Sequence, residues 1–102
     1  MNMPMAIQHF FNEESLDTAM SAFAEYAVVI DEGNTYTGRT AIRARRVASR
    51  EPYDFVSEPF DLFSRGDIVT IPANLRGNFP GSPVLLDYDF RLMMNRTVEL
   101  ES

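Results

Sequence analysis

The chain contains no cysteine and no tryptophan, and it has a single histidine, His9. Without cysteine there is neither a disulfide nor a thiolate nucleophile. One histidine among carboxylates does not suggest a transition-metal site. The sequence also lacks a phosphate-binding loop, a dinucleotide-binding fingerprint and a serine nucleophile elbow. We therefore expect neither a metal nor an organic cofactor.

A surplus of positive charge and a long apolar run are missing as well. The formal net charge is −6, which argues against nucleic acid as a partner, and no apolar run is as long as a membrane span. The first residues do not resemble a secretory signal, so a cytoplasmic location is the default expectation. At 102 residues the chain fits one domain, residues 1–102, whose modest core dimerisation would help to stabilise.

Lysine is absent too, so all nine cationic side chains are arginines. Five of them fall within residues 39–50: Arg39, Arg43, Arg45, Arg46 and Arg50. Such a cluster is typical of a solvated helix face that complements acidic surface on the same chain or on a partner subunit. That interpretation is favoured, and an anion-binding patch is the alternative.

The spacing of apolar residues predicts three short helices. The first covers residues 4–12, and the second covers residues 16–24 with Ser15 as its N-cap. The third covers residues 40–49 and is amphipathic, with an apolar stripe on a different side from most of its arginines. This stripe consists of Ala41, Ala44, Val47 and Ala48.

Alternation of apolar and polar residues predicts the strands. They cover residues 27–31, 36–37, 53–63, 68–79, 84–93 and 97–101. A turn at Asn34-Thr35 joins the first two strands, and Pro59 implies a bulge or an edge position in the third. The alternation places Tyr88 on the apolar face of its strand. Helices followed by an antiparallel meander make an α+β protein.

Two carboxylates, Asp31 and Glu32, directly follow the apolar stretch 27–30. Such a pair is costly to bury unless it is hydrogen-bonded, paired or functional. Because strand side chains alternate, the two point to opposite faces, and Glu32 is expected to pair with an arginine. Asp31 either opens into a pocket or caps the hairpin by accepting N–H bonds near Gly33 and Asn34.

Two segments resemble a known family. One is residues 23–43, FAEYAVVIDEGNTYTGRTAIR, and the other is residues 77–88, GNFPGSPVLLDY. They are similar to the SnoaL-like branch of the nuclear transport factor 2-like superfamily, which includes ketosteroid isomerases, polyketide cyclases, dehydratases and proteins without known activity. The resemblance implies a cone-shaped, curved antiparallel sheet wrapped around about three helices. It also implies a pocket at the mouth of the cone and a homodimer through the convex sheet face.

The same resemblance implies catalytic roles for Asp31 and Tyr88. Asp31 falls where the ketosteroid isomerase branch places its general base. Tyr88 falls where that branch has a protonated aspartate in its oxyanion hole, and a phenol can donate the same hydrogen bond. The main oxyanion donor of that branch is a first-helix tyrosine, and here Ile7 or Phe10 takes its place. Steroid isomerisation is therefore not expected, whereas a simpler proton transfer fits.

Six further side chains are predicted to contact the ligand. They are His9, Phe10, Tyr36, Tyr53, Phe55 and Phe79. The aromatic residues would line the pocket or belong to the core. His9 either pairs with Asp31 or is a surface residue.

Two functions remain open. The first is a cofactor-independent isomerase-, cyclase- or dehydratase-like enzyme that acts on a small, largely apolar, carbonyl-bearing ligand. The second is a non-enzymatic dimeric binding module on the same fold. Asp31 at the strand end favours the first, and the missing first-helix phenol favours the second.

Overall fold

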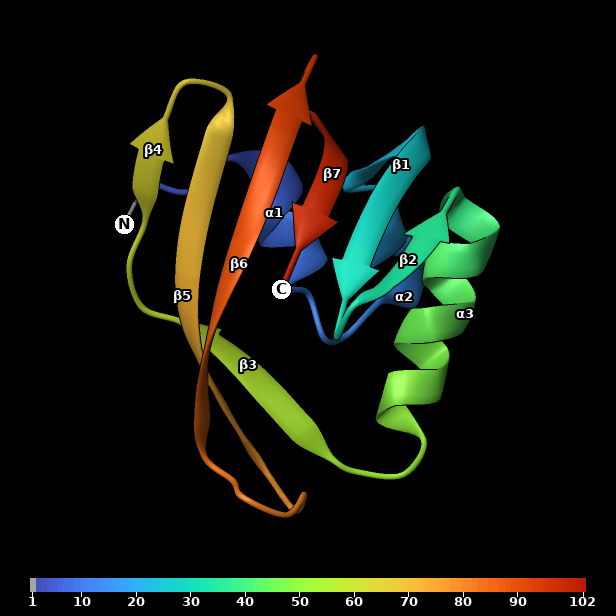
Figure 1. Cartoon of the computed structure of the whole chain (residues 1–102), viewed down its shortest axis with the longest axis vertical. Coiled ribbons are helices and arrows are strands. Elements are labelled where there is room, and N and C mark those ends of the chain that lie inside the picture. The colour runs from blue at the N-terminus through green and yellow to red at the C-terminus, as the bar shows by residue number, and fades with distance from the viewer. Residues whose placement is uncertain (1) are drawn as a thin grey trace.

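One curved sheet of seven strands dominates the computed structural model, which describes residues 2–102 (Figure 1). In chain order the elements are α1 (Met5–Phe10), α2 (Leu16–Met20), β1 (Phe23–Asp31), β2 (Asn34–Thr37), α3 (Arg39–Arg50), β3 (Phe55–Pro59), β4 (Phe63–Arg65), β5 (Ile68–Gly77), β6 (Val84–Met93) and β7 (Arg96–Glu101). The strand order is β2-β1-β7-β6-β5-β3, and β4 also pairs with β5. The predicted α+β class, with three helices and a curved sheet, is confirmed.

The sheet is mixed rather than purely antiparallel. All neighbouring strands are antiparallel except β1 and β7, which run parallel. β1 forms a hairpin with β2 at one edge, and β7 pairs with its other edge from the far end of the chain. This pairing is non-local, so no short-range pattern in the sequence reveals its direction.

The inner face of the sheet is buried against α1 and α2, which lie behind the sheet in Figure 1. Alternate residues of β5 and β6 form much of this face: Val69, Ile71, Ala73, Tyr88 and Phe90. Ile7 of α1 and Met20 of α2 belong to the same apolar cluster. The predicted alternation of these two strands therefore holds. No helix within residues 2–102 has the length and apolarity needed to cross a membrane.

The second helix is shorter than predicted. Ser15 caps it as expected, accepting a hydrogen bond from the backbone N–H of Thr18 at 3.1 Å. The helix ends at Met20, however, and Phe23 already pairs with Thr97 in the sheet. The apolar residues are spaced by three and four, which fits a helix that continues to residue 24. Residues 23 and 24 instead belong to β1, which pairs with β7.

The hairpin after β1 turns two residues earlier than predicted. Glu32 and Gly33 form the turn with φ values of 51° and 79°, so Asn34 already pairs with Asp31 as the first residue of β2. Positive φ at both central positions is the pattern of a two-residue hairpin, in which glycine is favoured because it has no Cβ.

The predicted strand at residues 53–63 is two strands. β3 ends at Pro59, and β4 begins at Phe63. Both pair with the same edge of β5, and β3 lies at the end of the strand order. The edge position predicted from Pro59 is therefore confirmed, since an edge strand tolerates the missing N–H.

The predicted apolar stripe of α3 is wrong. Ile42 is the buried residue of this helix. Three of the four stripe residues, Ala44, Val47 and Ala48, are exposed. Small side chains offer little area to bury, so the side that carries Ile42 faces the sheet.

Arginines attach α3 to the rest of the molecule beside β1 and β2 (Figure 1). Arg39 donates from Nε and Nη2 to the carbonyl oxygen of Phe23 at 3.0 and 2.6 Å. Arg43 pairs with Asp17 of α2 at 2.8 Å. The helix is thus positioned by polar contacts around one buried isoleucine, which leaves the space beneath its C-terminal half free of apolar packing.

Candidate functional site

A cavity of about 640 Å³ is lined by the inner face of the sheet, by α3 and by the segment that follows α1. Its wall is largely apolar and includes Phe11, Leu75 and Leu86. Asp31 from the end of β1 and Tyr88 from the middle of β6 both line it. The two residues predicted to act together therefore share one concave site.

Asp31 is held by an ion pair within the cavity wall. Its Oδ2 accepts hydrogen bonds from Nε and Nη2 of Arg45 at 3.1 and 3.0 Å. Its Oδ1 accepts one from the Ser102 hydroxyl at 3.3 Å. These contacts replace the alternative prediction that Asp31 caps the hairpin through Gly33 and Asn34.

Glu32 lies on the exposed turn beside this pair. Its Oε2 is 3.9 Å from Nη2 of Arg45, and its side chain is 80% exposed. The hydrogen bond to Asp31 is the main cause that raises the pKa of Arg45, and desolvation of the guanidinium opposes it. Arg45 therefore stays charged and serves mainly as the counterion of Asp31.

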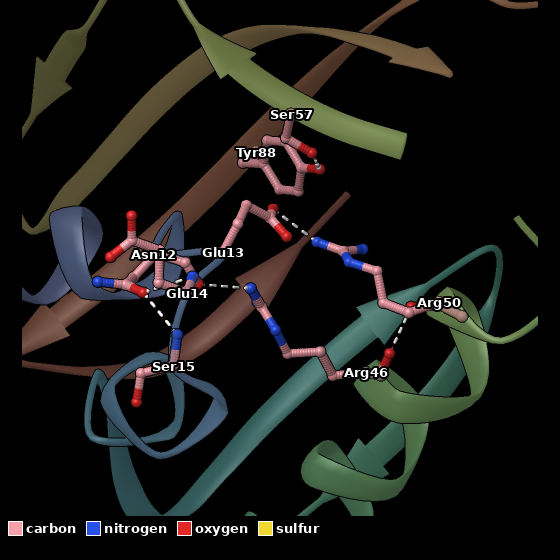
Figure 2. Close-up of polar contacts among 9 residues, drawn as sticks. Asn12, Glu13, Glu14, Ser15, Arg46, Arg50, Ser57 and Tyr88 are labelled. Atoms are coloured by element: carbon pink, nitrogen blue, oxygen red, sulfur yellow. Dashed lines mark hydrogen bonds and ion pairs between the residues drawn. The ribbon is translucent and has the colours of Figure 1, made fainter. Parts of the chain in front are cut away.

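Tyr88 is nearly buried, with 8% of its surface exposed. Its ring packs against Phe10 and Phe11 at centroid distances of 5.5 and 5.2 Å. Its hydroxyl lies 3.2 Å from the Ser57 hydroxyl (Figure 2). Burial raises the pKa of Tyr88, while the bond with Ser57 and the charge of Arg50 oppose that effect. The phenol therefore keeps its proton and can act as a hydrogen-bond donor.

Two further arginines extend from α3 toward the segment after α1, as Figure 2 shows. Arg46 donates from Nη2 to the Asn12 carbonyl oxygen at 3.2 Å, and its guanidinium lies 5.2 Å from the Phe10 ring centre. Arg50 pairs with Glu13 at 2.8 Å. Burial is the main cause that lowers the pKa of Arg46, and the charge of Arg50 is the second cause.

Sequence analysis assigned no role in the cavity to Arg45, Arg46 or Arg50, yet all three line it. Their spacing from Ile42 indicates that they lie on the inward side of the helix. They follow Ile42 by three, four and eight positions, so they share the helix side of the largest aliphatic residue in the segment.

Four of the six residues predicted to contact a ligand line the cavity: Phe10, Tyr53, Phe55 and Phe79. Phe55 and Phe79 pack edge to face at 6.0 Å. The other two lie elsewhere. His9 Nδ1 lies 3.3 Å from the Ser21 hydroxyl oxygen. The ring of Tyr36 packs against the guanidinium of Arg45, with 5.6 Å between the ring centre and Cζ. His9 is therefore not placed to pair with Asp31.

The first helix offers no hydrogen-bond donor side chain at the positions considered. Phe10 lines the cavity, whereas Ile7 is fully buried in the core. Within residues 2–102 no group of three or more histidine, aspartate or glutamate side chains is arranged to hold a metal ion. The polar groups that face the cavity are carboxylates, guanidinium groups and hydroxyls.

No protein-family model matches the chain, and no curated protein matches it. Solved structures do match. A candidate polyketide cyclase from Sinorhizobium meliloti is 34% identical, with a TM-score of 0.92 and coverage of 97% of this chain and 94% of that one. A protein with a ketosteroid isomerase-like fold from Catenulispora acidiphila, solved with trimethylamine, is 18% identical (TM-score 0.78, coverage 98% and 85%). A candidate isomerase of the SnoaL-like family from Agrobacterium tumefaciens is also 18% identical (TM-score 0.77, coverage 95% and 92%).

The buried hydroxyl of Tyr88 should make the free energy of unfolding depend on pH in the alkaline range. Because its pKa is raised in the folded state, its contribution is fully present at neutral pH. That contribution declines once the pH passes the ordinary tyrosine pKa of about 10, and it is lost as the pH rises through the folded-state pKa. We expect the free energy of unfolding to fall more steeply in this range for the wild type than for Tyr88→Phe, as measured by urea denaturation at several pH values.

Tyr26→Phe is the matched control, since Tyr26 is 80% exposed. Its alkaline profile should follow that of the wild type. If the profiles of Tyr88→Phe and the wild type coincide, the hydroxyl of Tyr88 is not desolvated as described.

Proposed function

Because this chain belongs to the SnoaL-like branch of the nuclear transport factor 2-like superfamily, we propose that its cavity binds a small, largely apolar, carbonyl-bearing molecule and transfers a proton on it. Asp31 is the general base, and Tyr88 donates a hydrogen bond to the carbonyl oxygen. The observation that carries this proposal is that both residues line one cavity of about 640 Å³. That volume lies within the range of small-molecule sites.

The surroundings of Asp31 decide which protons it can take. Arg45 occupies Oδ2 with two hydrogen bonds, while Oδ1 accepts one long bond from Ser102. Each carboxylate oxygen can accept two hydrogen bonds, so Oδ1 keeps room for an incoming proton. A carboxylate is in general a mild base for removing a proton from carbon. The C–H bond that it breaks must therefore be acidic, as it is beside one carbonyl or between two.

The proposed reaction needs no cofactor. The carbon proton moves to Asp31, and the electron pair of the C–H bond delocalises onto the carbonyl oxygen as an enolate. Protonated Asp31 then returns its proton in one of three ways. In isomerisation the proton goes to another carbon of the enolate; in dehydration it goes to a β-hydroxyl group, which the enolate expels as water; in ring closure it goes to the alkoxide that forms when the enolate attacks a second carbonyl of the same molecule. The choice depends on the ligand.

Tyr88 suits the enolate oxygen because its hydroxyl is protonated and desolvated. A preorganised donor in an apolar site stabilises developing negative charge far better than water does. Ser57 holds the hydroxyl at 3.2 Å and fixes its position. Because Phe10 takes the place of the first-helix tyrosine, that helix supplies no second phenol, so we expect a slower reaction than in an isomerase that has both donors.

Deuterium uptake from D₂O at the carbon beside the carbonyl of 2-tetralone tests this proposal by NMR. The wild type should accelerate exchange over buffer. Asp31→Asn should lose on the order of a hundredfold or more, the usual contribution of a positioned general base. Tyr88→Phe should lose less, because only the donor to the oxygen is removed.

Asp87→Asn is the matched control, since Asp87 is exposed on the opposite face of β6 from Tyr88. It should exchange at the wild-type rate. If the wild type binds 2-tetralone without accelerating exchange, the proton-transfer proposal is contradicted and the binding module remains.

The second candidate function is a dimeric binding module without catalysis. Two observations favour it: the firm pairing of Asp31 with Arg45 and the exposed apolar side chains on the outer face of the sheet. Leu85 on β6 is 74% exposed, and Val56 on β3 is 38% exposed. We propose that a homodimer forms through this convex face and covers them.

Light scattering after size exclusion tests the dimer. The wild type should have twice the mass of the 11.6 kDa chain, and Leu85→Glu should shift it to the monomer because a charge would be desolvated in the interface. Met94→Glu is the control, at an apolar residue in a turn that is even more exposed, at 93%. A wild-type monomer at every concentration contradicts the dimer.

A further inference from the structure

Six charged side chains line the cavity: Glu13, Asp31, Glu32, Arg45, Arg46 and Arg50. Their formal charges cancel, but their pairing is uneven. Arg45 forms ion pairs with Asp31 and Glu32 of the β1–β2 hairpin, and Arg50 forms one with Glu13. Arg46 has no such partner among residues 2–102, because no carboxylate oxygen there lies within 4 Å of its guanidinium nitrogens.

The environment of Arg46 disfavours a lone positive charge. Desolvation is the main cause that lowers its pKa, and the neighbouring charge of Arg50 adds to it. A guanidinium has five N–H bonds, and one of them reaches a protein acceptor, the Asn12 carbonyl oxygen. The Phe10 ring packs against the guanidinium, with 5.2 Å between the ring centre and Cζ of Arg46. A partly desolvated cation with free donors gains most from an anion that enters the cavity.

We propose that the cavity selects ligands that carry a carboxylate, and that Arg46 binds this group. The inference rests on the proposed function of the cavity as a small-molecule site. The planar guanidinium can hold both oxygens of a carboxylate with two parallel hydrogen bonds. The apolar body of the ligand then lies against the aromatic wall formed by Phe55 and Phe79.

The position of Arg46 makes this arrangement compatible with proton transfer. Arg46 and Tyr88 each influence the pKa of the other electrostatically, and Asp31 influences that of Tyr88. Arg46 of α3, Tyr88 of β6 and Asp31 of β1 therefore line the same cavity close enough to influence one another. A ligand held by its carboxylate at α3 would present its carbonyl group to the sheet, where Asp31 and Tyr88 lie.

An alternative role for Arg46 is purely structural. Its hydrogen bond to Asn12 ties α3 to the segment after α1, and a structural link would be lost on substitution without any effect on ligand choice. Selectivity between two ligands of the same shape separates the two roles, because a structural link does not distinguish a carboxylate from an amide.

The test uses 2-naphthoate and its neutral isostere 2-naphthamide, titrated into the full chain at neutral pH and followed by heteronuclear NMR. We expect the wild type to bind naphthoate about ten- to a hundredfold more tightly than naphthamide, as a charge-assisted hydrogen-bonded pair predicts. Arg46→Met keeps most of the side-chain length and should abolish this preference, because it weakens naphthoate binding much more than naphthamide binding. Arg46→Lys should retain part of the preference, and it covers the case in which the methionine variant folds poorly.

Arg43→Met is the matched control, since it removes the same charge from the same helix. Arg43 is paired with Asp17 and does not line the cavity, so the preference for naphthoate should survive. Equal losses in Arg43→Met and Arg46→Met would overturn the proposal in favour of a general charge effect. Equal wild-type affinity for both probes would overturn it while leaving the cavity a binding site. No binding of either probe would count against both this proposal and the proposed function.

Discussion

The placement of α3 by arginine side chains is the constraint on which the site depends. One residue of the helix, Ile42, is buried, while Arg39 and Arg43 bind a backbone carbonyl and a carboxylate of the α2–β1 region. Had the helix packed on the sheet through a broad apolar stripe, its side chains would have filled the space beneath it. Polar attachments around one isoleucine instead leave a cavity whose wall combines apolar strands with charged groups.

This arrangement gives the cavity its chemical character. Phe55 of β3 and Phe79 of the β5–β6 loop contribute the aromatic wall, and β6 contributes Tyr88. The end of β1 contributes Asp31, and α3 contributes the guanidinium groups. Arg45 donates two hydrogen bonds to Asp31 and so fixes the position of this carboxylate at the edge of an apolar space. Arg46 keeps free donors. These groups are the basis on which we propose an acidic, carbonyl-bearing ligand for the site.

Much of the fold could be predicted from sequence, because local patterns agree with the final environment. Apolar and charged residues alternate from position 86 to position 92, and the strand Val84–Met93 forms with the predicted bounds. The end of α2 could not be predicted, since the N–H of Thr97 from β7 binds the Ala22 carbonyl oxygen there. Sequence reasoning placed Asp31 in a pocket wall, where it lies, but gave Arg46 no place there. Counting apolar residues on α3 treated arginine as solvated, although its long stem packs well in a partly buried wall.

Hydrogen exchange of the α3 amides as a function of salt tests the central claim most directly. Raising sodium chloride from about 50 mM to about 1 M shortens the screening length to roughly 3 Å, which weakens the ion pairs of the helix and strengthens apolar packing. If arginines hold α3 in place, its amides should exchange roughly tenfold faster at high salt while those of β5 and β6 keep their protection. Unchanged or increased protection of α3 would mean that apolar packing holds the helix, and it would contradict the account of how this cavity is formed.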